Sequence, residues 1–275
     1  MIAVATIEGA REALTSLPRP LGFVPTMGAL HDGHLQLVRS ARDTCASVAA
    51  SVFVNPLQFA PGEDFERYPR DPQGDATKLE AGGVDVLFAP PAHVLYPPGF
   101  STGIDLGPIC TAYEGRIRPG HFRGVATVVA KLLNIVQPDV LYVGQKDAQQ
   151  TAVLRKLVAE LAFPVRVHVV PTVREPDGLA LSSRNVYLDA RQRAAAPTLH
   201  VALRAMLEAL RAGEPVAVAR ERALSVLHPL AHVEYLDVVN ADTFEPVERL
   251  APPVFVVGAA RFGSTRLLDN LWVTA

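Results

Sequence analysis

The chain has 275 residues, of which 49% are hydrophobic and 20% are charged, and its formal net charge is −2. This composition is typical of a globular protein large enough for two domains, and the lack of net positive charge argues against binding to nucleic acid or to an anionic membrane. Cys45 and Cys110 are the only cysteines and follow no disulfide or zinc spacing, which favours a reducing compartment. Because residues 1–8 lack a signal-peptide pattern and no apolar run reaches the roughly 20 residues of a membrane helix, we expect a cytoplasmic protein.

The most informative segment is predicted to form a strand, a glycine-bearing turn and a helix. The strand covers residues 21–25, and the helix begins near His34. The helix carries apolar residues at a spacing that buries one face, namely Leu35, Val38, Ala41 and Cys45. A helix start leaves backbone N–H groups unpaired and attracts anions.

Two histidines, His31 and His34, lie at this helix start in an H-x-G-H pattern. Two imidazoles three residues apart, with a glycine that lets the backbone come close, suit a polyphosphate. They are also compatible with surface or capping histidines, or with metal ligation, although a complete zinc site usually needs three or four ligands.

Strands and helices alternate along the first two-thirds of the chain. In order, we expect a strand at 48–54, a helix at 71–81, a strand at 84–88, a Pro- and Gly-rich excursion at 89–120, a helix at 122–136, a strand at 140–143, a helix at 147–161 and a strand at 165–170. This alternation predicts an α/β fold with a doubly wound, Rossmann-like parallel sheet.

The pattern changes near residue 171. Helices at 190–210 and 216–227 are followed by strands at 232–239, 254–258 and 267–273, which predicts a smaller α+β domain. We therefore expect a first domain at 1–171 and a second at 172–275.

Polar residues gather after four of the expected strands. These groups are Met27 to His34, Asn55 to Phe59, Gly144 to Asp147 with Gln150, and Val173-Arg174 followed by Leu181 to Asn185. Because the carboxyl ends of parallel strands share one edge of a sheet, where ligands bind, we expect these groups to form one site.

Each group also has a plainer interpretation. Asp147 is expected to cap the following helix, but capping does not explain Lys146, whose charge is disfavoured at a helix start unless an anion binds there. Residues 182–185 could be a polar linker, although two hydroxyls and a guanidinium are donors that suit a triphosphate. Gln58 and Gln150 could be surface amides, or they could bind the hydroxyl and carboxylate of a small acid.

Several common signatures are missing from the sequence. It contains no G-x-x-x-x-G-K-[ST] phosphate loop, no G-x-G-x-x-G fingerprint and no G-x-S-x-G nucleophile elbow. The H-x-G-H turn instead resembles that of the nucleotidyltransferases that include the class I tRNA synthetases.

Over most of its length the chain resembles the pantothenate synthetase (pantoate–β-alanine ligase) family. The resemblance depends on the joint order of short motifs: Pro25 to His34, Phe53 to Phe59, Tyr68-Pro69-Arg70, His121 to Val125, Lys131 to Asp139, Gly144 to Gln150 and Leu181 to Asn185. It implies an ATP-dependent ligation of pantoate and β-alanine that gives pantothenate, AMP and pyrophosphate. It also implies a pantoyl-adenylate intermediate, Mg²⁺, a homodimer, and a smaller domain that acts as a lid.

The resemblance also implies roles for individual residues. His34, Lys146, His31 and Arg184 would be catalytic, with His34 donating a proton to the departing pyrophosphate and Lys146 reaching the phosphates. The ATP-binding residues would be Met27, Gly28, Ala29, Leu30, His31, Asp32, Gly33, His34, Gly144, Gln145, Lys146, Asp147, Val173, Leu181, Ser182, Ser183 and Arg184. Gln58 and Gln150 would bind pantoate, Gln58 would also contact β-alanine, and Asp75 is a candidate carboxylate near the metal.

The sequence departs from the common family pattern at four positions that spare the charged and hydrogen-bonding groups: Leu181, Gln145, Ala148 and Val143. Two alternatives stay open at this point. One is another small-molecule nucleotidyltransferase with the H-x-G-H turn, and the other is a nucleotide-binding regulatory module without catalysis. A tRNA synthetase is disfavoured, since no basic RNA-binding region is present.

Overall fold

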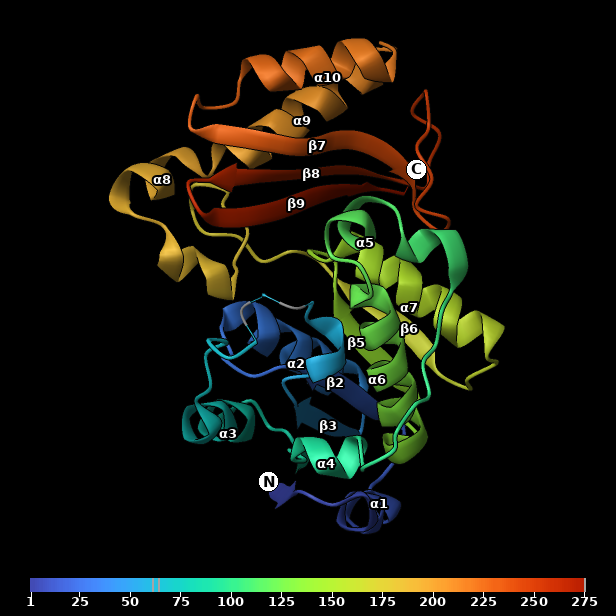
Figure 1. Ribbon diagram of the computed structural model, residues 1–275. Helices are drawn as coiled ribbons and strands as arrows, with labels where there is room; N and C mark the ends of the chain where they lie inside the picture. Colours follow the sequence, from blue (N-terminus) through green and yellow to red (C-terminus); the bar gives the residue numbers. More distant parts are fainter. Residues whose placement is uncertain (61, 64, 275) are drawn as a thin grey trace. The chain divides into compact units, whose positions relative to one another are not determined.

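The computed structural model describes residues 1–60, 62–63 and 65–274, which divide into two compact units. The first unit comprises Met1–Gly144 and Val153–Val170, and the second comprises Gln145–Ala152 and Pro171–Ala275. The second unit thus begins directly after the strand that ends at Gly144. Figure 1 shows the elements of both units.

The first unit is built on a parallel sheet with strand order β1-β4-β3-β2-β5-β6. Its strands are β1 (Ile2–Val4), β2 (Leu21–Thr26), β3 (Ser47–Val52), β4 (Val86–Phe88), β5 (Val140–Gly144) and β6 (Arg166–Val170). Its helices are α1 (Ile7–Thr15), α2 (Asp32–Thr44), α3 (Pro72–Ala81), α4 (Ala92–Leu95), α5 (Tyr113–Ile117) and α6 (His121–Val136), with short 3-10 turns η1 (Pro56–Gln58) and η2 (Gly107–Cys110). Helix α7 (Ala148–Glu160) starts in the second unit and continues into the first.

The central strands are apolar because both faces of the sheet are covered. Helix α2 packs on β2, β3 and β5, and helix α6 packs on β2 and on α1. Strand β3 is buried from Ser47 to Ser51. This is the expected pattern for a parallel strand between two helical layers.

The strand order reverses between β2 and β5. From β2 the chain steps outward to β3 and then β4, whereas β5 pairs on the other side of β2. In doubly wound sheets, ligands bind outside the carboxyl ends of the strands at such a reversal. The segments that follow β2 and β5 are those that carry the H-x-G-H motif and Lys146.

The second unit contains an antiparallel sheet with strand order β7-β8-β9, made of β7 (Ala231–Asn240), β8 (Val254–Phe262) and β9 (Thr265–Val273). Helices α8 (Ala190–Ala195), α9 (Thr198–Arg211) and α10 (Val216–Ser225) precede it, together with the 3-10 turn η3 (Ser183–Tyr187). Helix α9 packs on β8 and β9, and its buried apolar residues share a core with α10 and the sheet.

The structure confirms the predicted fold class and corrects several element bounds. The single helix expected at 190–210 is two helices, α8 and α9, because Pro197 cannot continue the ladder of helical hydrogen bonds. Helix α2 begins at Asp32 rather than near His34, and its buried face includes Leu37, whereas Leu35 is only half-buried. The excursion at 89–120 contains the short helices α4 and α5.

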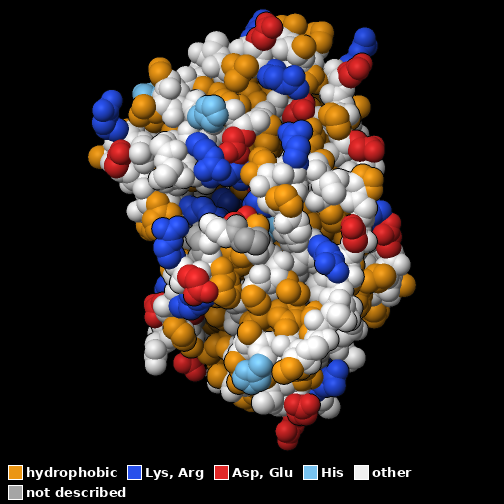
Figure 2. Space-filling model, viewed as in Figure 1, with side chains coloured by type: hydrophobic (Ala, Val, Ile, Leu, Met, Phe, Trp, Pro, Cys, Tyr) orange, Lys and Arg blue, Asp and Glu red, His pale blue; other side chains and the backbone are white. Residues whose placement is uncertain are grey.

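In the described part of the chain, no helix is both long and apolar enough to cross a lipid bilayer. Figure 2 shows both acidic and basic side chains on the visible face.

Candidate active site

The turn that follows β2 is held by a buried carboxylate. Asp75 of α3 is 2% exposed, and its two oxygens accept hydrogen bonds from the backbone N–H groups of Ala29 (2.9 Å) and Leu30 (2.8 Å). Gly28 has a φ of +85°, and a Cβ there would lie 2.8 Å from an Asp75 oxygen. The turn therefore requires glycine at this position. These backbone bonds give the Asp75 carboxylate a structural role in the turn.

The two histidines of the motif cap helix α2 reciprocally. The Nδ1 of His31 accepts from the backbone N–H of Gly33 at 3.1 Å, and the Nδ1 of His34 accepts from the backbone N–H of His31 at 3.3 Å. Because Nδ1 is the acceptor in both rings, each neutral imidazole carries its proton on Nε2. The capping interpretation and the catalytic interpretation are therefore compatible, since capping uses Nδ1 of His34 and not Nε2.

The Gln58 side chain belongs to a buried amide network that determines its orientation. Asn55 is 1% exposed; its Oδ1 accepts from the Leu57 N–H and the Tyr96 hydroxyl, and its Nδ2 donates to the Gly124 carbonyl. These partners leave only one possible orientation of the Asn55 amide. The same Nδ2 donates to Gln58 Oε1 at 3.0 Å, so the Gln58 Nε2 is a donor, and it lies 2.8 Å from the Met27 sulfur.

The main chain of Gln58 is also fixed. Its carbonyl accepts from His121 Nδ1 at 2.9 Å and from Arg118 at 3.3 Å, and Arg118 pairs with Glu63 through two hydrogen bonds of 2.9 and 2.7 Å. Burial, reinforced by the Arg118 charge, lowers the pKa of His121 to about 4. Burial opposes ionisation of Glu63, but the Arg118 pairing outweighs it, so the pKa of this carboxyl is lowered.

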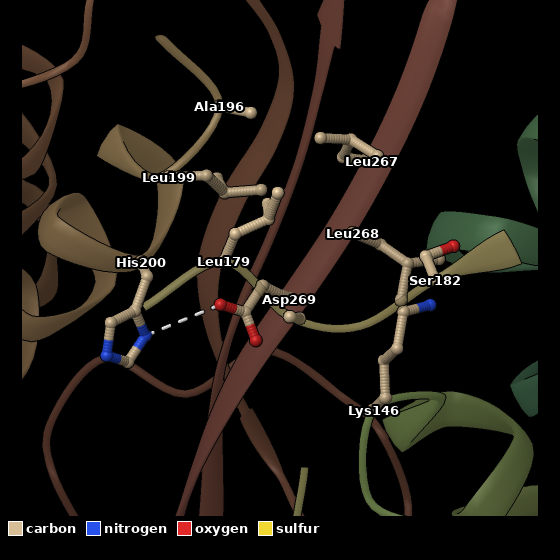
Figure 3. Close-up of a pocket in the computed structure, with 10 residues that line it drawn as sticks. Lys146, Leu179, Ser182, Ala196, Leu199, His200, Leu267, Leu268 and Asp269 are labelled. Carbon is tan, nitrogen blue, oxygen red and sulfur yellow. Dashed lines mark ion pairs between the residues drawn. The ribbon is translucent and has the colours of Figure 1, made fainter. Parts of the chain in front are cut away.

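In the second unit, Lys146 and Ser182 line one pocket (Figure 3). Its other polar residues are His200 and Asp269, and its apolar wall is Leu179, Ala180, Ala196, Leu199, Leu267 and Leu268. The Lys146 side chain is 21% exposed, and its amine lies 3.7 Å from Asp147. The amine and the hydroxyl are donors that suit an anion, and the carboxylate of Asp269 in the same lining is paired with Arg174.

A buried ion pair organises the segment before Ser182. Arg174 makes two hydrogen bonds to Asp269, at 2.6 and 2.9 Å, and also donates to the carbonyls of Gly178 and Asn270. The His200 Nδ1 lies 3.4 Å from Asp269. Burial opposes the ionisation of Asp269, yet His200 and Arg174 together lower its pKa, so it is a fixed negative charge.

The predicted site residues are divided between the two units, and the contacts described above join only Met27 with Gln58 in the first unit and Lys146 with Ser182 in the second. Met27 to His34, Gln58 and Gly144 belong to the first unit, whereas Gln145 to Asp147, Gln150, Val173 and Leu181 to Arg184 belong to the second. Helix α7 begins directly after Asp147, whose carbonyl accepts the Thr151 N–H, as expected for the residue before a helix. Of the positions that depart from the family pattern, Val143 and Ala148 are buried.

The sequence does not single out three residues that hold parts of the candidate site by hydrogen bonds, namely Tyr96, Asp269 and Asn270. Each lies far along the chain from the residue it holds, and no local pattern marks it. In the sequence His121 stands out only as part of a family motif, and its contact with the Gln58 carbonyl spans 63 residues.

Within the described residues, no group of three or more His, Cys, Asp or Glu side chains is arranged to hold a metal ion. The two histidines of the motif use Nδ1 in capping, and Asp75 uses both oxygens on backbone N–H groups. The part of the chain that the structure describes therefore contains no site in which three or more such side chains hold a metal ion.

Comparison with known proteins identifies the family. The model of the pantoate–β-alanine ligase family matches residues 3–272. The chain belongs to this family. A pantothenate synthetase from Chloroflexus aurantiacus is 55% identical over 254 residues, which cover 91% of this chain and 90% of the relative. One from Roseiflexus castenholzii is 50% identical over 273 residues, which cover 98% of each chain.

Solved structures of pantothenate synthetases share the fold of this family member. The crystal structure of pantothenate synthetase from Thermus thermophilus has a TM-score of 0.94 at 49% identity and covers 100% of both chains. The pantoate–β-alanine ligase from Francisella tularensis, solved in complex with β-γ ATP and β-alanine, has a TM-score of 0.80 at 35% identity and covers 99% of this chain and 97% of that one. The chain is therefore an enzyme of the ligase class.

Proposed function

We propose that this ligase adenylates pantoate with ATP and then transfers the pantoyl group to β-alanine. The products are pantothenate, AMP and pyrophosphate. The family match across residues 3–272 supports the reaction, and the relative solved in complex with β-γ ATP and β-alanine supports these two substrates. Among the described residues, the observation that carries the proposal furthest is the pocket that Lys146 and Ser182 line together.

In the first step, a carboxylate oxygen of pantoate attacks the α-phosphorus of ATP. The bond from that phosphorus to the bridging oxygen of the β-phosphate breaks, and pyrophosphate leaves with the electron pair. Negative charge grows on the phosphoryl oxygens and on the leaving group, so fixed donors lower the barrier. We assign this role to Lys146, Ser182, Ser183 and Arg184, with His34 acting on the pyrophosphate through Nε2–H.

The donor set of Gln58 fits the recognition of pantoate. Because Asn55 occupies Gln58 Oε1, the remaining Nε2 presents N–H groups, which suit the carboxylate or hydroxyl oxygen of a small acid. We assign pantoate binding to Gln58 and Gln150, with Gln58 also contacting β-alanine.

In the second step, the amine of β-alanine attacks the acyl carbon of pantoyl-adenylate. The bond from that carbon to the AMP oxygen breaks, AMP leaves with this oxygen, and the new amide nitrogen loses a proton. No protein nucleophile takes part. The smaller unit would act as a lid that shields the mixed anhydride from water.

Three further parts of the proposal come from the family resemblance: Mg²⁺, a homodimer and a cytoplasmic location. Mg²⁺ commonly binds through substrate phosphates and few protein ligands, which is compatible with the lack of a protein-only metal site among residues 1–60, 62–63 and 65–274. We assign no step to the ion.

The test is exchange of labelled pyrophosphate into ATP in the absence of β-alanine. We expect exchange that depends on pantoate, since adenylation is reversible before the amine attacks. Exchange with another small acid but not with pantoate would instead favour a different nucleotidyltransferase. Binding of ATP with no exchange under any acid would contradict catalysis altogether.

A further inference from the structure

A single buried side chain of β9, that of Asn270, holds the backbone at Gln145 and Lys146. The Nδ2 group of Asn270 donates to the carbonyls of both Gln145 and Lys146, each at 2.9 Å, and its Oδ1 accepts from Gln145 Nε2 at 3.1 Å. Two carbonyl acceptors on one side permit only one orientation of the Asn270 amide. Asn270 is 1% exposed, and both N–H groups of its amide are used.

Packing of the sheet alone does not require an asparagine at this place. Asn270 pairs in register with the buried Val257 of β8, where an apolar residue would avoid the cost of burying an amide. The two carbonyls that it satisfies lie before α7 and are outside the helical hydrogen-bond ladder, so they need another partner. Asn270 provides it.

The neighbouring residue of β9 anchors a second segment that the proposed function assigns to ATP. Asp269 binds Arg174 at 2.6 and 2.9 Å, and Arg174 in turn donates to the Gly178 carbonyl. The Val173 carbonyl accepts the Leu181 N–H at 2.9 Å, directly before Ser182. Figure 3 shows Lys146, Ser182 and Asp269 around the same pocket.

We propose that Asn270 is a positioning residue for Lys146: its amide fixes the Gln145–Lys146 backbone so that the lysine amine is held ready for the ATP phosphates. This inference rests on the proposed role of Lys146. The Gln145 side chain is complementary to that of Asn270, because its N–H group donates a hydrogen bond to the Asn270 Oδ1.

The test compares Asn270→Ala, Lys146→Ala and the double variant in pantoate-dependent pyrophosphate exchange. A shift of about 1 Å in a positioned group can cost about 100-fold in rate. We therefore expect Asn270→Ala to lower kcat/KM for ATP by about 10- to 100-fold, with the KM for pantoate changed less than about 3-fold. The double variant should be no slower than Lys146→Ala, because both changes remove the same interaction.

Asn240→Ala is the matched control. Asn240 also caps a backbone turn, with its Oδ1 accepting from Asp242 and Thr243 at 2.9 and 3.0 Å, but it lies outside the proposed machinery. We expect normal exchange from this variant. If Asn270→Ala does not fold, Asn270→Asp tests the same contact, because it keeps the shape of the side chain but replaces the donor to the two carbonyls by an acceptor, and it should raise the KM for ATP selectively.

Hydrogen exchange provides a readout that does not depend on activity. The backbone amides of residues 146–148 should exchange faster in Asn270→Ala than in the native chain. Normal kinetics of Asn270→Ala beside an impaired Lys146→Ala would overturn the inference alone, as would additive losses in the double variant. Normal exchange of pyrophosphate by Lys146→Ala would overturn the proposed role of Lys146 as well.

Discussion

The histidines of the H-x-G-H turn show how one residue can serve structure and chemistry together. His34 Nδ1 accepts the His31 backbone N–H, which satisfies a donor that the start of α2 leaves unpaired. That bond also fixes the tautomer, so the ring can act as a donor only through Nε2. A neutral ring that donates a hydrogen bond is sufficient to stabilise charge on the leaving pyrophosphate.

Replacing this donor should slow adenylation strongly. We predict that His34→Ala raises the activation barrier by about 2.7–4 kcal/mol, or about 10²–10³-fold in kcat, by analogy with the loss of one donor to a developing oxyanion. Pyrophosphate exchange at saturating ATP and pantoate measures this. His93 of α4 is exposed, and His93→Ala is a matched control that should retain full activity. Near-normal turnover by His34→Ala would refute the assignment.

His121 makes stability depend on pH. Its pKa is lowered from 6.5 to about 4 by burial and then by the Arg118 charge. Between these values the unfolded chain binds a proton that the folded chain does not, so lowering the pH favours unfolding. We predict that the contribution of His121 to the free energy of unfolding has its full value above pH 6.5. The free energy of unfolding then falls by up to about 3 kcal/mol as the pH approaches 4.

Urea unfolding from pH 7 to pH 4.5 tests this prediction when the native chain is compared with His121→Gln. The glutamine can still donate a hydrogen bond but does not titrate. The contributions of the other titrating groups therefore largely cancel when the free energies of unfolding of the two chains are subtracted. The two stability curves should converge as the pH falls. Parallel curves would show that His121 does not titrate as described.

At the scale of elements, the sequence predicts best what is local. The strand-turn-helix at residues 21–44 and the helix after Asp147 follow from apolar spacing and helix-start residues, and both are present. The break between α8 and α9 could have been predicted from Pro197. The hydrogen bonds from Asn270 to the Lys146 carbonyl and from His121 to the Gln58 carbonyl join residues that are 124 and 63 positions apart. Such contacts come from tertiary packing, which no local pattern encodes.

The contact between α6 and η1 is the element-scale feature that positions Gln58. A Cβ on Gly124 would lie 2.2 Å from the Leu57 carbonyl oxygen and 2.6 Å from the Gln58 nitrogen. Helix α6 therefore approaches η1 as closely as only glycine allows. The Asn55 bond to the Gly124 carbonyl depends on the same approach.

Gly124→Ala should separate these elements. We predict a loss of about 1–3 kcal/mol in the free energy of unfolding, because backbone atoms have little room to move, and a raised KM for pantoate. Denaturant unfolding and steady-state kinetics measure the two effects. Gly9→Ala in α1 is the control, since its nearest neighbour is the Thr6 hydroxyl at 3.1 Å and its KM for pantoate should not change. An unchanged pantoate KM in Gly124→Ala would argue against this role of the contact.

At the scale of the whole molecule, the predicted α/β fold and the ligase family are confirmed. The domain bounds at 171–172 and the individual site residues remain predictions. Residues 145–152 show why a boundary is hard to derive from sequence. The first residues of α7 lie in this segment and belong to the second unit, whereas the rest of the helix belongs to the first unit. Gln145 and Lys146 at the start of this segment are hydrogen-bonded to Asn270 of β9, which lies 125 and 124 positions away.

The central claim is that the carboxylate of pantoate attacks the α-phosphorus of ATP. Pantoate labelled with ¹⁸O in its carboxylate tests it most directly, with mass spectrometry of the products of one turnover in the presence of β-alanine. We predict one labelled oxygen in AMP, the second retained in the amide of pantothenate, and none in pyrophosphate. Unlabelled AMP, or label in pyrophosphate, would contradict an adenylate intermediate.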